Sequence, residues 1–228
     1  MAQYDRMAVL NAIFDAGIVP VFYNKDPETT IRIVEACARG GARCVEFTNR
    51  GDLAHHVFTE AVRHVMANKL DVIMGVGSIA DAPTAALYIA NGANFVVGPL
   101  LNEEVARLCN RRKIAYSPGC GSVTEIGQAE ELGVEIVKVF PGSEVGGPAF
   151  VKSVLGPCPW TRIMPTGGVD ATRESLESWV KAGVAAVGAG SKLITKELVD
   201  AKDWDGLAEK VAQSVHWIKE IRTEMANA

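Results

Sequence analysis

No apolar run in this sequence is long enough to cross a bilayer, because glycine or a charged residue interrupts every candidate stretch. The first residues also lack the basic segment and apolar stretch of a secretion signal. The net charge is −4 and charges of both signs are mixed along the chain, so no basic surface for nucleic acid or an anionic membrane is indicated. We therefore expect a cytoplasmic protein with no membrane or nucleic-acid partner.

Paired metal-ligand motifs are absent as well. The five cysteines form no CxxC pair and are accompanied by no paired-histidine spacing, so neither a disulfide framework nor a structural zinc site is indicated. His55, His56 and His64 fit a helix surface better than a metal site. Cys120 lies in a glycine-rich loop and could be reactive, but a bystander thiol is the favoured interpretation. We expect no metal and no cofactor.

What the chain does have is a regular alternation of apolar, β-rich runs and helix-like stretches, at intervals of roughly 20–30 residues, which is typical of βαβ units. The predicted strands are residues 18–23, 43–48, 71–76, 94–97, 113–116, 135–140, 162–165 and 185–189. Cap signals such as Asp26, Asp81 and Ser122 precede the helical stretches, and glycines follow several of them. No linker or composition shift divides the chain.

Eight strands in strict alternation with helices predict an α/β fold, a single-domain (β/α)₈ TIM barrel over residues 1–228, with the active site at the C-terminal ends of the strands. An open, doubly wound sheet is the alternative. Residues 203–225 are predicted to form a helix that covers the barrel after the eighth strand.

The most informative single residue is Lys138, near the end of an apolar strand. Ile136, Lys138 and Phe140 share one face of that strand, while Val137 and Val139 share the other. An amine buried there loses hydration, so its pKa falls and the neutral form can attack a ketone to give a Schiff base. The alternative is a lysine whose stem lines the strand end while its ammonium reaches solvent.

A glutamate and an arginine share one face of the second predicted strand. Cys44, Glu46, Thr48 and Arg50 alternate with Val45 and Phe47. Charges on an inward face are costly without partners, so the two could simply pair with each other or with Lys138. The functional interpretation, which we favour, is that Glu46 moves protons and Arg50 holds a substrate carboxylate.

Two glycine-rich turns follow the seventh and eighth predicted strands: Pro165-Thr166-Gly167-Gly168-Val169 and Gly188-Ala189-Gly190-Ser191. In barrels, these two turns commonly bind phosphate through backbone N–H groups. The alternative is two tight turns that bind nothing.

Together, these segments resemble the 2-keto-3-deoxy-6-phosphogluconate (KDPG) and 4-hydroxy-2-oxoglutarate (KHG) aldolases. The resemblance rests on an ordered set of motifs: Val45-Glu46-Phe47-Thr48-Asn49-Arg50, Gly75-Val76-Gly77-Ser78, Val137-Lys138-Val139-Phe140-Pro141, Pro165-Thr166-Gly167-Gly168 and Gly190-Ser191. The set covers nearly the whole chain. Members of this family are class I lyases on a compact (β/α)₈ barrel, typically homotrimers that need no metal.

The resemblance implies a role for each matching residue. Lys138 would form the Schiff base and Glu46 would relay protons. The expected substrate-binding residues are Arg50 and Ser78 for the carboxylate, Pro99 and Phe140 for the pyruvyl group, and Gly167, Gly168, Gly190 and Ser191 for a phosphate. The substrate is therefore expected to be a small 2-keto-3-deoxy acid, most readily a phosphorylated one.

The chain departs from the family pattern beside these residues. Ser78 replaces the usual threonine and keeps its hydroxyl, whereas Asn49 replaces a usual leucine next to Arg50. These departures leave the aldehyde partner and its stereochemistry open. Two other functions also remain open on this barrel: a phosphosugar isomerase or epimerase that uses Glu46 as a base, and a non-catalytic protein that binds keto acids or sugar phosphates.

Overall fold

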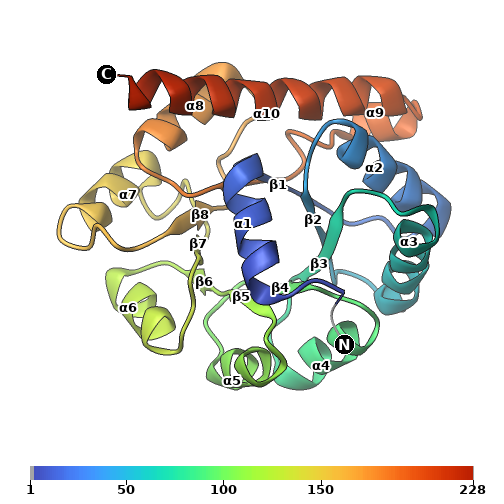
Figure 1. Ribbon diagram of the computed structural model, residues 1–228, viewed down its shortest axis with the longest axis horizontal. Helices are drawn as coiled ribbons and strands as arrows, with labels where there is room; N and C mark the ends of the chain where they lie inside the picture. The colour runs from blue at the N-terminus through green and yellow to red at the C-terminus, as the bar shows by residue number, and fades with distance from the viewer. Residues whose placement is uncertain (1–2, 228) are drawn as a thin grey trace.

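The computed structural model describes residues 3–227, in which parallel strands alternate with helices (Figure 1). The strands are β1 (Ile18–Phe22), β2 (Cys44–Thr48), β3 (Ile73–Gly77), β4 (Phe95–Val97), β5 (Ala115–Ser117), β6 (Gly119–Cys120), β7 (Val137–Val139), β8 (Ile163–Pro165) and β9 (Val187–Ala189). The helices are α1 (Arg6–Ala16), α2 (Pro27–Arg39), α3 (Ala54–Asn68), α4 (Ala82–Ala90), α5 (Glu103–Arg112), α6 (Val123–Glu131), α7 (Gly147–Leu155), α8 (Arg173–Lys181), α9 (Lys196–Asp200) and α10 (Trp204–Ala226).

The strands form a ring. One sheet has the order β5-β4-β3-β2-β1-β9 and the other has the order β6-β7-β8, with parallel pairing between neighbours. A bridge between Thr166 and Gly188 joins β8 to β9, and only Pro118 separates β5 from β6. The predicted (β/α)₈ barrel is confirmed, and the alternative of an open, doubly wound sheet is wrong.

The fifth strand differs from its prediction, which placed a strand at residues 113–116 and Cys120 in a glycine-rich loop. In the structure β5 pairs with β4, and the chain continues after Pro118 as β6, which pairs with β7. Proline has no N–H to donate, so the ladder is interrupted at Pro118 and the strand changes partner there. Its carbonyl still accepts from the N–H of Lys138 at 3.0 Å, which ties the break to the strand that carries the lysine.

The helices begin where the sequence predicted caps. The side chains of Asp26, Asp81 and Ser122 accept hydrogen bonds from the backbone N–H groups of Thr29, Thr84 and Glu125. Each cap satisfies a donor that the first turn of a helix leaves without an intrahelical partner. Local sequence therefore sets the starts of α2, α4 and α6.

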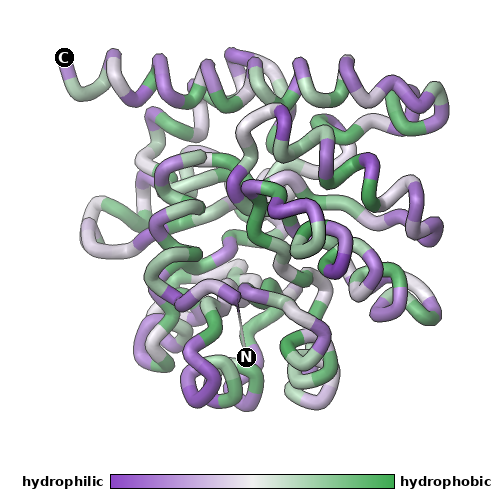
Figure 2. The backbone as a smooth tube through the Cα atoms, turned by 45° about the vertical axis from the view of Figure 1, so that its right-hand side comes forward, coloured by the Kyte–Doolittle hydropathy of each residue, from purple (hydrophilic) through white to green (hydrophobic). Residues whose placement is uncertain are grey.

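Buried side chains form two layers. Val45, Phe47 and Val137 belong to the larger cluster, between the sheet and the surrounding helices. Cys44 and Ile136 belong to a second cluster inside the barrel. The side chains of β2 and β7 therefore alternate as predicted. Glu46 lies on the inward face of β2, and Lys138 lies on the inward face of β7. Figure 2 shows hydrophobic and hydrophilic segments alternating along α10, as expected for a helix with one buried face.

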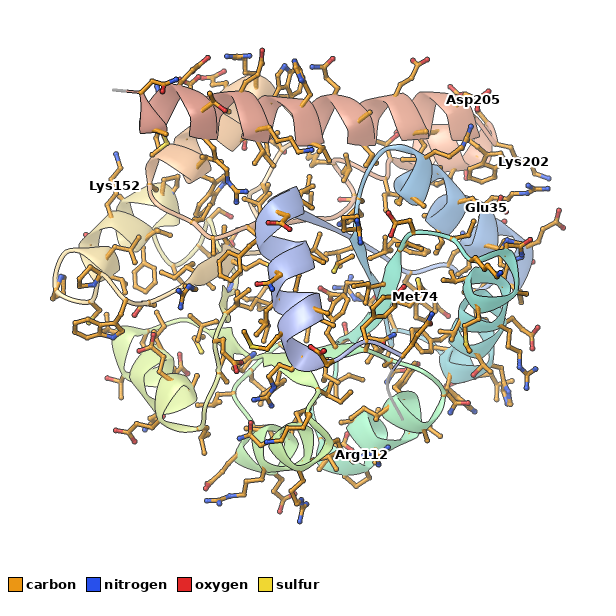
Figure 3. All side chains as sticks on the ribbon, viewed as in Figure 1. Glu35, Met74, Arg112, Lys152, Lys202 and Asp205 are labelled. Atoms are coloured by element: carbon orange, nitrogen blue, oxygen red, sulfur yellow. The ribbon has the colours of Figure 1, made fainter. Side chains whose placement is uncertain are left out.

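Helix α1 closes the N-terminal end of the barrel, a feature that we did not predict from the sequence. It lies across the centre of the ring in Figure 1, and Val9, Leu10 and Ile13 join the interior cluster. Helix α10 packs against α2 and α8 and so lies in the outer ring. Figure 3 shows Arg112 and Lys152 at the periphery, whereas Met74 is buried between β3 and the helices. Within residues 3–227, no helix has the length and apolar character needed to cross a membrane.

We expect Ile13→Ala to lower the free energy of unfolding by about 2 to 5 kcal/mol, because it opens a cavity where α1 seals the barrel. Ile13 is only 2% exposed. Met7→Ala is the matched control: Met7 lies on the same helix but is 62% exposed, and its loss should change stability by less than about 0.5 kcal/mol. Urea unfolding of both variants checks this, and equal losses would contradict the sealing role of α1.

Candidate active site

Lys138 places its amine inside the barrel. It lies on β7 opposite Gly119 of β6 and Met164 of β8, and it is only 5% exposed. Its Nζ lies 4.8 Å from the centroid of the Phe140 ring. Burial lowers the pKa of Lys138, the positive charge of Arg50 lowers it further, and the negative charge of Glu46 opposes this change. A larger fraction of this amine is therefore neutral near pH 7 than in an ordinary lysine.

Glu46 lies on the inward face of β2 and is 1% exposed. Its carboxylate rests against the backbone of β3 at Gly77, where any side chain would collide with Oε1. Within residues 3–227, neither carboxylate oxygen has a hydrogen-bond partner. Burial raises the pKa of Glu46, while the positive charges of Lys138 and Arg50 oppose that change. The site thus holds a carboxyl group that can take up or release a proton at a pH where an ordinary carboxylate stays ionised.

Arg50 lies two residues beyond the end of β2, in the same period-two register as Glu46. Its Nε donates to Oγ of Ser78, the residue that follows β3, at 3.3 Å, whereas within residues 3–227 the Glu46 carboxylate accepts no hydrogen bond from it. Ser78 has a φ of +59°, an unusual conformation for a residue other than glycine, and it directs the chain out of β3 beside the arginine. The guanidinium remains exposed, so its donors are available to a ligand.

A cavity of about 700 Å³ opens at the C-terminal ends of the strands. Its lining contains six of the predicted substrate-binding residues: Arg50, Phe140, Gly167, Gly168, Gly190 and Ser191. Their side chains and turns come from β2, β7, β8 and β9, so the barrel brings together residues that are far apart in sequence.

Within residues 3–227, the other four predicted residues, Lys138, Glu46, Ser78 and Pro99, are not among those that line this cavity. The amine of Lys138 lies over the ring of Phe140, and Phe140 is a lining residue. Glu46 lies on the inward face of the strand that ends at Thr48, a lining residue. Ser78 is linked through its hydrogen bond to Arg50. The Pro99 carbonyl packs against Gly119, which is opposite Lys138 in the sheet.

Several lining residues were not singled out from the sequence. Tyr23 and Asn24 follow β1, and Lys192 and Lys196 follow β9. Their positions at or soon after the ends of predicted strands were the available signal, because barrel sites are built from those loops. The described residues 3–227 contain no group of three or more His, Cys, Asp or Glu side chains placed to hold a metal ion.

Comparison with known proteins identifies the family. Residues 9–210 match the family model described as KDPG and KHG aldolase. The chain belongs to the KDPG and KHG aldolase family. A 2-dehydro-3-deoxy-phosphogluconate aldolase of Haemophilus influenzae is 28% identical over 95% of this chain and all of its own length. The enzyme of the same description from Pseudoalteromonas atlantica is 31% identical over 89% of this chain and 92% of its own.

Solved structures support the same assignment. A KDPG aldolase from Legionella pneumophila, with pyruvate captured as a covalent carbinolamine intermediate, is 26% identical with a TM-score of 0.80, covering 89% of this chain and 96% of its own. A thiamine phosphate pyrophosphorylase from Pyrococcus furiosus has a TM-score of 0.67, covering 90% of this chain and 98% of its own, at 13% identity, so that likeness is one of fold alone. The barrel is thus shared widely, whereas the aldolase motifs distinguish the family.

We expect the stability difference between Glu46→Gln and the wild type to depend on pH. Because the pKa of Glu46 is raised in the folded state, that state binds more protons than the unfolded chain between the ordinary value of 4.5 and the raised one. Wild-type stability therefore loses about 1.4 kcal/mol per unit of pKa shift as the pH rises through this window, and the glutamine variant lacks that loss. Urea unfolding at several pH values measures this effect, and parallel curves would contradict it.

Proposed function

We propose that this protein is a class I aldolase that cleaves KDPG to pyruvate and glyceraldehyde 3-phosphate, or 4-hydroxy-2-oxoglutarate to pyruvate and glyoxylate. The observation that carries the proposal is the buried amine of Lys138, with a lowered pKa, in the same barrel interior as the unpartnered carboxyl of Glu46. Family membership makes aldol cleavage the reaction that this pair serves.

The reaction begins at the ketone. The neutral Nζ of Lys138 attacks C2, and the resulting carbinolamine loses water to become an iminium ion. Glu46 supplies and accepts the protons of this dehydration, a role that its raised pKa suits. The iminium withdraws electrons from the C3–C4 bond.

Cleavage follows when Glu46 removes the proton of the C4 hydroxyl. The C3–C4 bond breaks, its electron pair passes toward the iminium nitrogen to give an enamine of pyruvate, and the aldehyde leaves. Protonation of C3 regenerates the iminium, and water then releases pyruvate and restores the free amine. The reverse sequence is the aldol addition. Of the predicted set, the buried ionisable side chains are Lys138 and Glu46, and Lys138 is joined covalently to the substrate, so Glu46 serves both proton transfers.

Substrate orientation is assigned to the residues around the cavity. Arg50 pairs with the carboxylate through its forked guanidinium, and Ser78 holds the arginine and assists it. Pro99 and Phe140 enclose the pyruvyl group. Gly167 and Gly168 form a turn with two successive positive φ values, 93° and 73°, and with Gly190 and Ser191 this turn receives a phosphate. The resemblance further supports a cytoplasmic homotrimer.

The test of the covalent step is mass spectrometry after incubation with pyruvate and borohydride, followed by peptide mapping. We expect a reduced pyruvyl adduct on the peptide that contains Lys138. Lys138→Met should abolish the adduct, because it replaces the amine with an apolar chain of similar length. Lys152→Met, which alters an exposed lysine on α7, should leave the adduct intact.

A folded wild-type protein that gives no adduct would overturn the proposal. Turnover of a phosphosugar without an adduct would then indicate an isomerase or epimerase, and reversible binding without turnover would indicate a binding protein.

If these turns bind the phosphate, a change there should alter the KM for the phosphorylated substrate more than the KM for the unphosphorylated one. Ser191→Asp places a negative charge against the phosphate site, so the KM for KDPG should rise at least about ten-fold. The KM for 4-hydroxy-2-oxoglutarate, which has no phosphate, should change less than about two-fold. Steady-state kinetics with both substrates measures this effect, and an equal rise for both would contradict the assigned phosphate position.

A further inference from the structure

The residues on either side of Arg50 each lie against a tyrosine. The Tyr88 hydroxyl on α4 donates to Oδ1 of Asn49 at 2.9 Å. The Tyr23 hydroxyl fills the space beside Gly51, where a side chain would collide with it. Arg50 therefore projects from a turn that is fixed at both flanks.

The two tyrosines are the ends of one aromatic cluster. Tyr88 packs edge-on against Phe58, with ring centroids 5.2 Å apart, and Phe58 lies 6.0 Å from Phe47. Phe47 in turn lies 5.7 Å from Tyr23. Phe47 belongs to β2, so the strand that carries Glu46 also anchors this cluster. Well-packed rings have little rotamer freedom, and their hydroxyls are therefore fixed in place.

The same turn is tied to β3. The N–H of Asn49 donates to the carbonyl of Gly77 at 2.9 Å, and Ser78, the residue that follows β3, accepts from Arg50. Arginine has a long, flexible side chain, and ordering it for binding costs conformational entropy. A turn fixed in advance reduces that cost, because the ligand then does less of the ordering.

Tyr88 is well suited to this task. It is fully buried, at 0% exposed, and burial raises its pKa to about 12, so its hydroxyl remains a donor. Within residues 3–227, neither Tyr88 nor Asn49 is among the residues that line the cavity. Asn49 stands between two lining residues, Thr48 and Arg50, and of these Arg50 carries the charge that a carboxylate recognises.

We propose that Tyr88, through its hydrogen bond to Asn49, is a positioning residue that orients Arg50 and so sets the affinity of the site for the carboxylate of a 2-oxo acid. This rests on the proposed function, in which Arg50 binds that carboxylate. Asn49, which departs from the leucine usual in the family, then acts as the acceptor that couples α4 to the arginine turn.

The test compares two ketones that differ only in the carboxylate: pyruvate and its methyl ester. The concentration that gives half-maximal borohydride-trapped adduct is measured for the wild type and for Tyr88→Phe, which keeps the ring and removes the hydroxyl. We expect the half-maximal pyruvate concentration to rise about five-fold in Tyr88→Phe, as for loss of one hydrogen bond, while that for methyl pyruvate stays within about two-fold. The maximal adduct should be unchanged for both.

Thr59→Val is the matched control. The Thr59 hydroxyl of α3 donates to Asn91 at 3.0 Å, just beyond the end of α4, so the variant loses a hydroxyl contact near α4 without touching the arginine turn. It should bind both ketones as the wild type does. Asn49→Leu should reproduce the pyruvate loss, and combining it with Tyr88→Phe should add no further loss, because both variants break the same bond.

Equal changes for the two ketones, or none for either, in Tyr88→Phe would overturn the positioning role while leaving the aldolase assignment intact. Absence of an adduct in the wild type would overturn both. If Tyr88→Phe does not fold, Asn49→Leu carries the same comparison, and an unchanged pyruvate response there would overturn the proposal.

Discussion

The burial of an amine and a carboxyl group in one barrel interior is the constraint on which the rest of the structure depends. Lys138 and Glu46 lose most of their hydration, and the carboxylate gains no hydrogen bond within residues 3–227. Such burial opposes folding, because charged groups are strongly favoured in water. The burial of apolar side chains at the other inward positions and beneath α1 stabilises the fold and offsets this cost. The same burial moves both pKa values toward neutrality, which the proposed chemistry requires.

The apolar layer and the polar strand ends have different roles: the first stabilises the barrel and the second is proposed to bind the ligand. The apolar shell between the sheet and the helices holds the strands, while the polar residues gather at their C-terminal ends. The cluster around Phe47 connects these tasks, since it stabilises the packing of α3 and α4 and also flanks Arg50. Stability and substrate orientation therefore share one set of side chains on this side of the barrel.

Much of this arrangement followed from local sequence. The period-two pattern placed Glu46 and Lys138 on inward faces, and the caps at Asp26, Asp81 and Ser122 marked helix starts. These features depend on residues close together in the chain, so a sequence shows them directly. The exchange of partners at Pro118 did not follow, because proline alone does not say which strand pairs next. The position of helix α1 was not predicted for a similar reason. Its side chains pack against inward residues of strands that are far apart in the sequence.

The sequence by itself determined the alternation of strands and helices, the inward set of charged residues and the motifs that identify the family. Only the tertiary structure decided that the Glu46 carboxyl has no hydrogen-bond partner within residues 3–227, that Arg50 donates to Ser78, and that Tyr88 donates to Asn49 across 39 positions of sequence. The physical reason is that burial and hydrogen bonding depend on distances between residues remote in the chain. The closure of the sheet into a barrel sets those distances, and they cannot be read from a local sequence pattern.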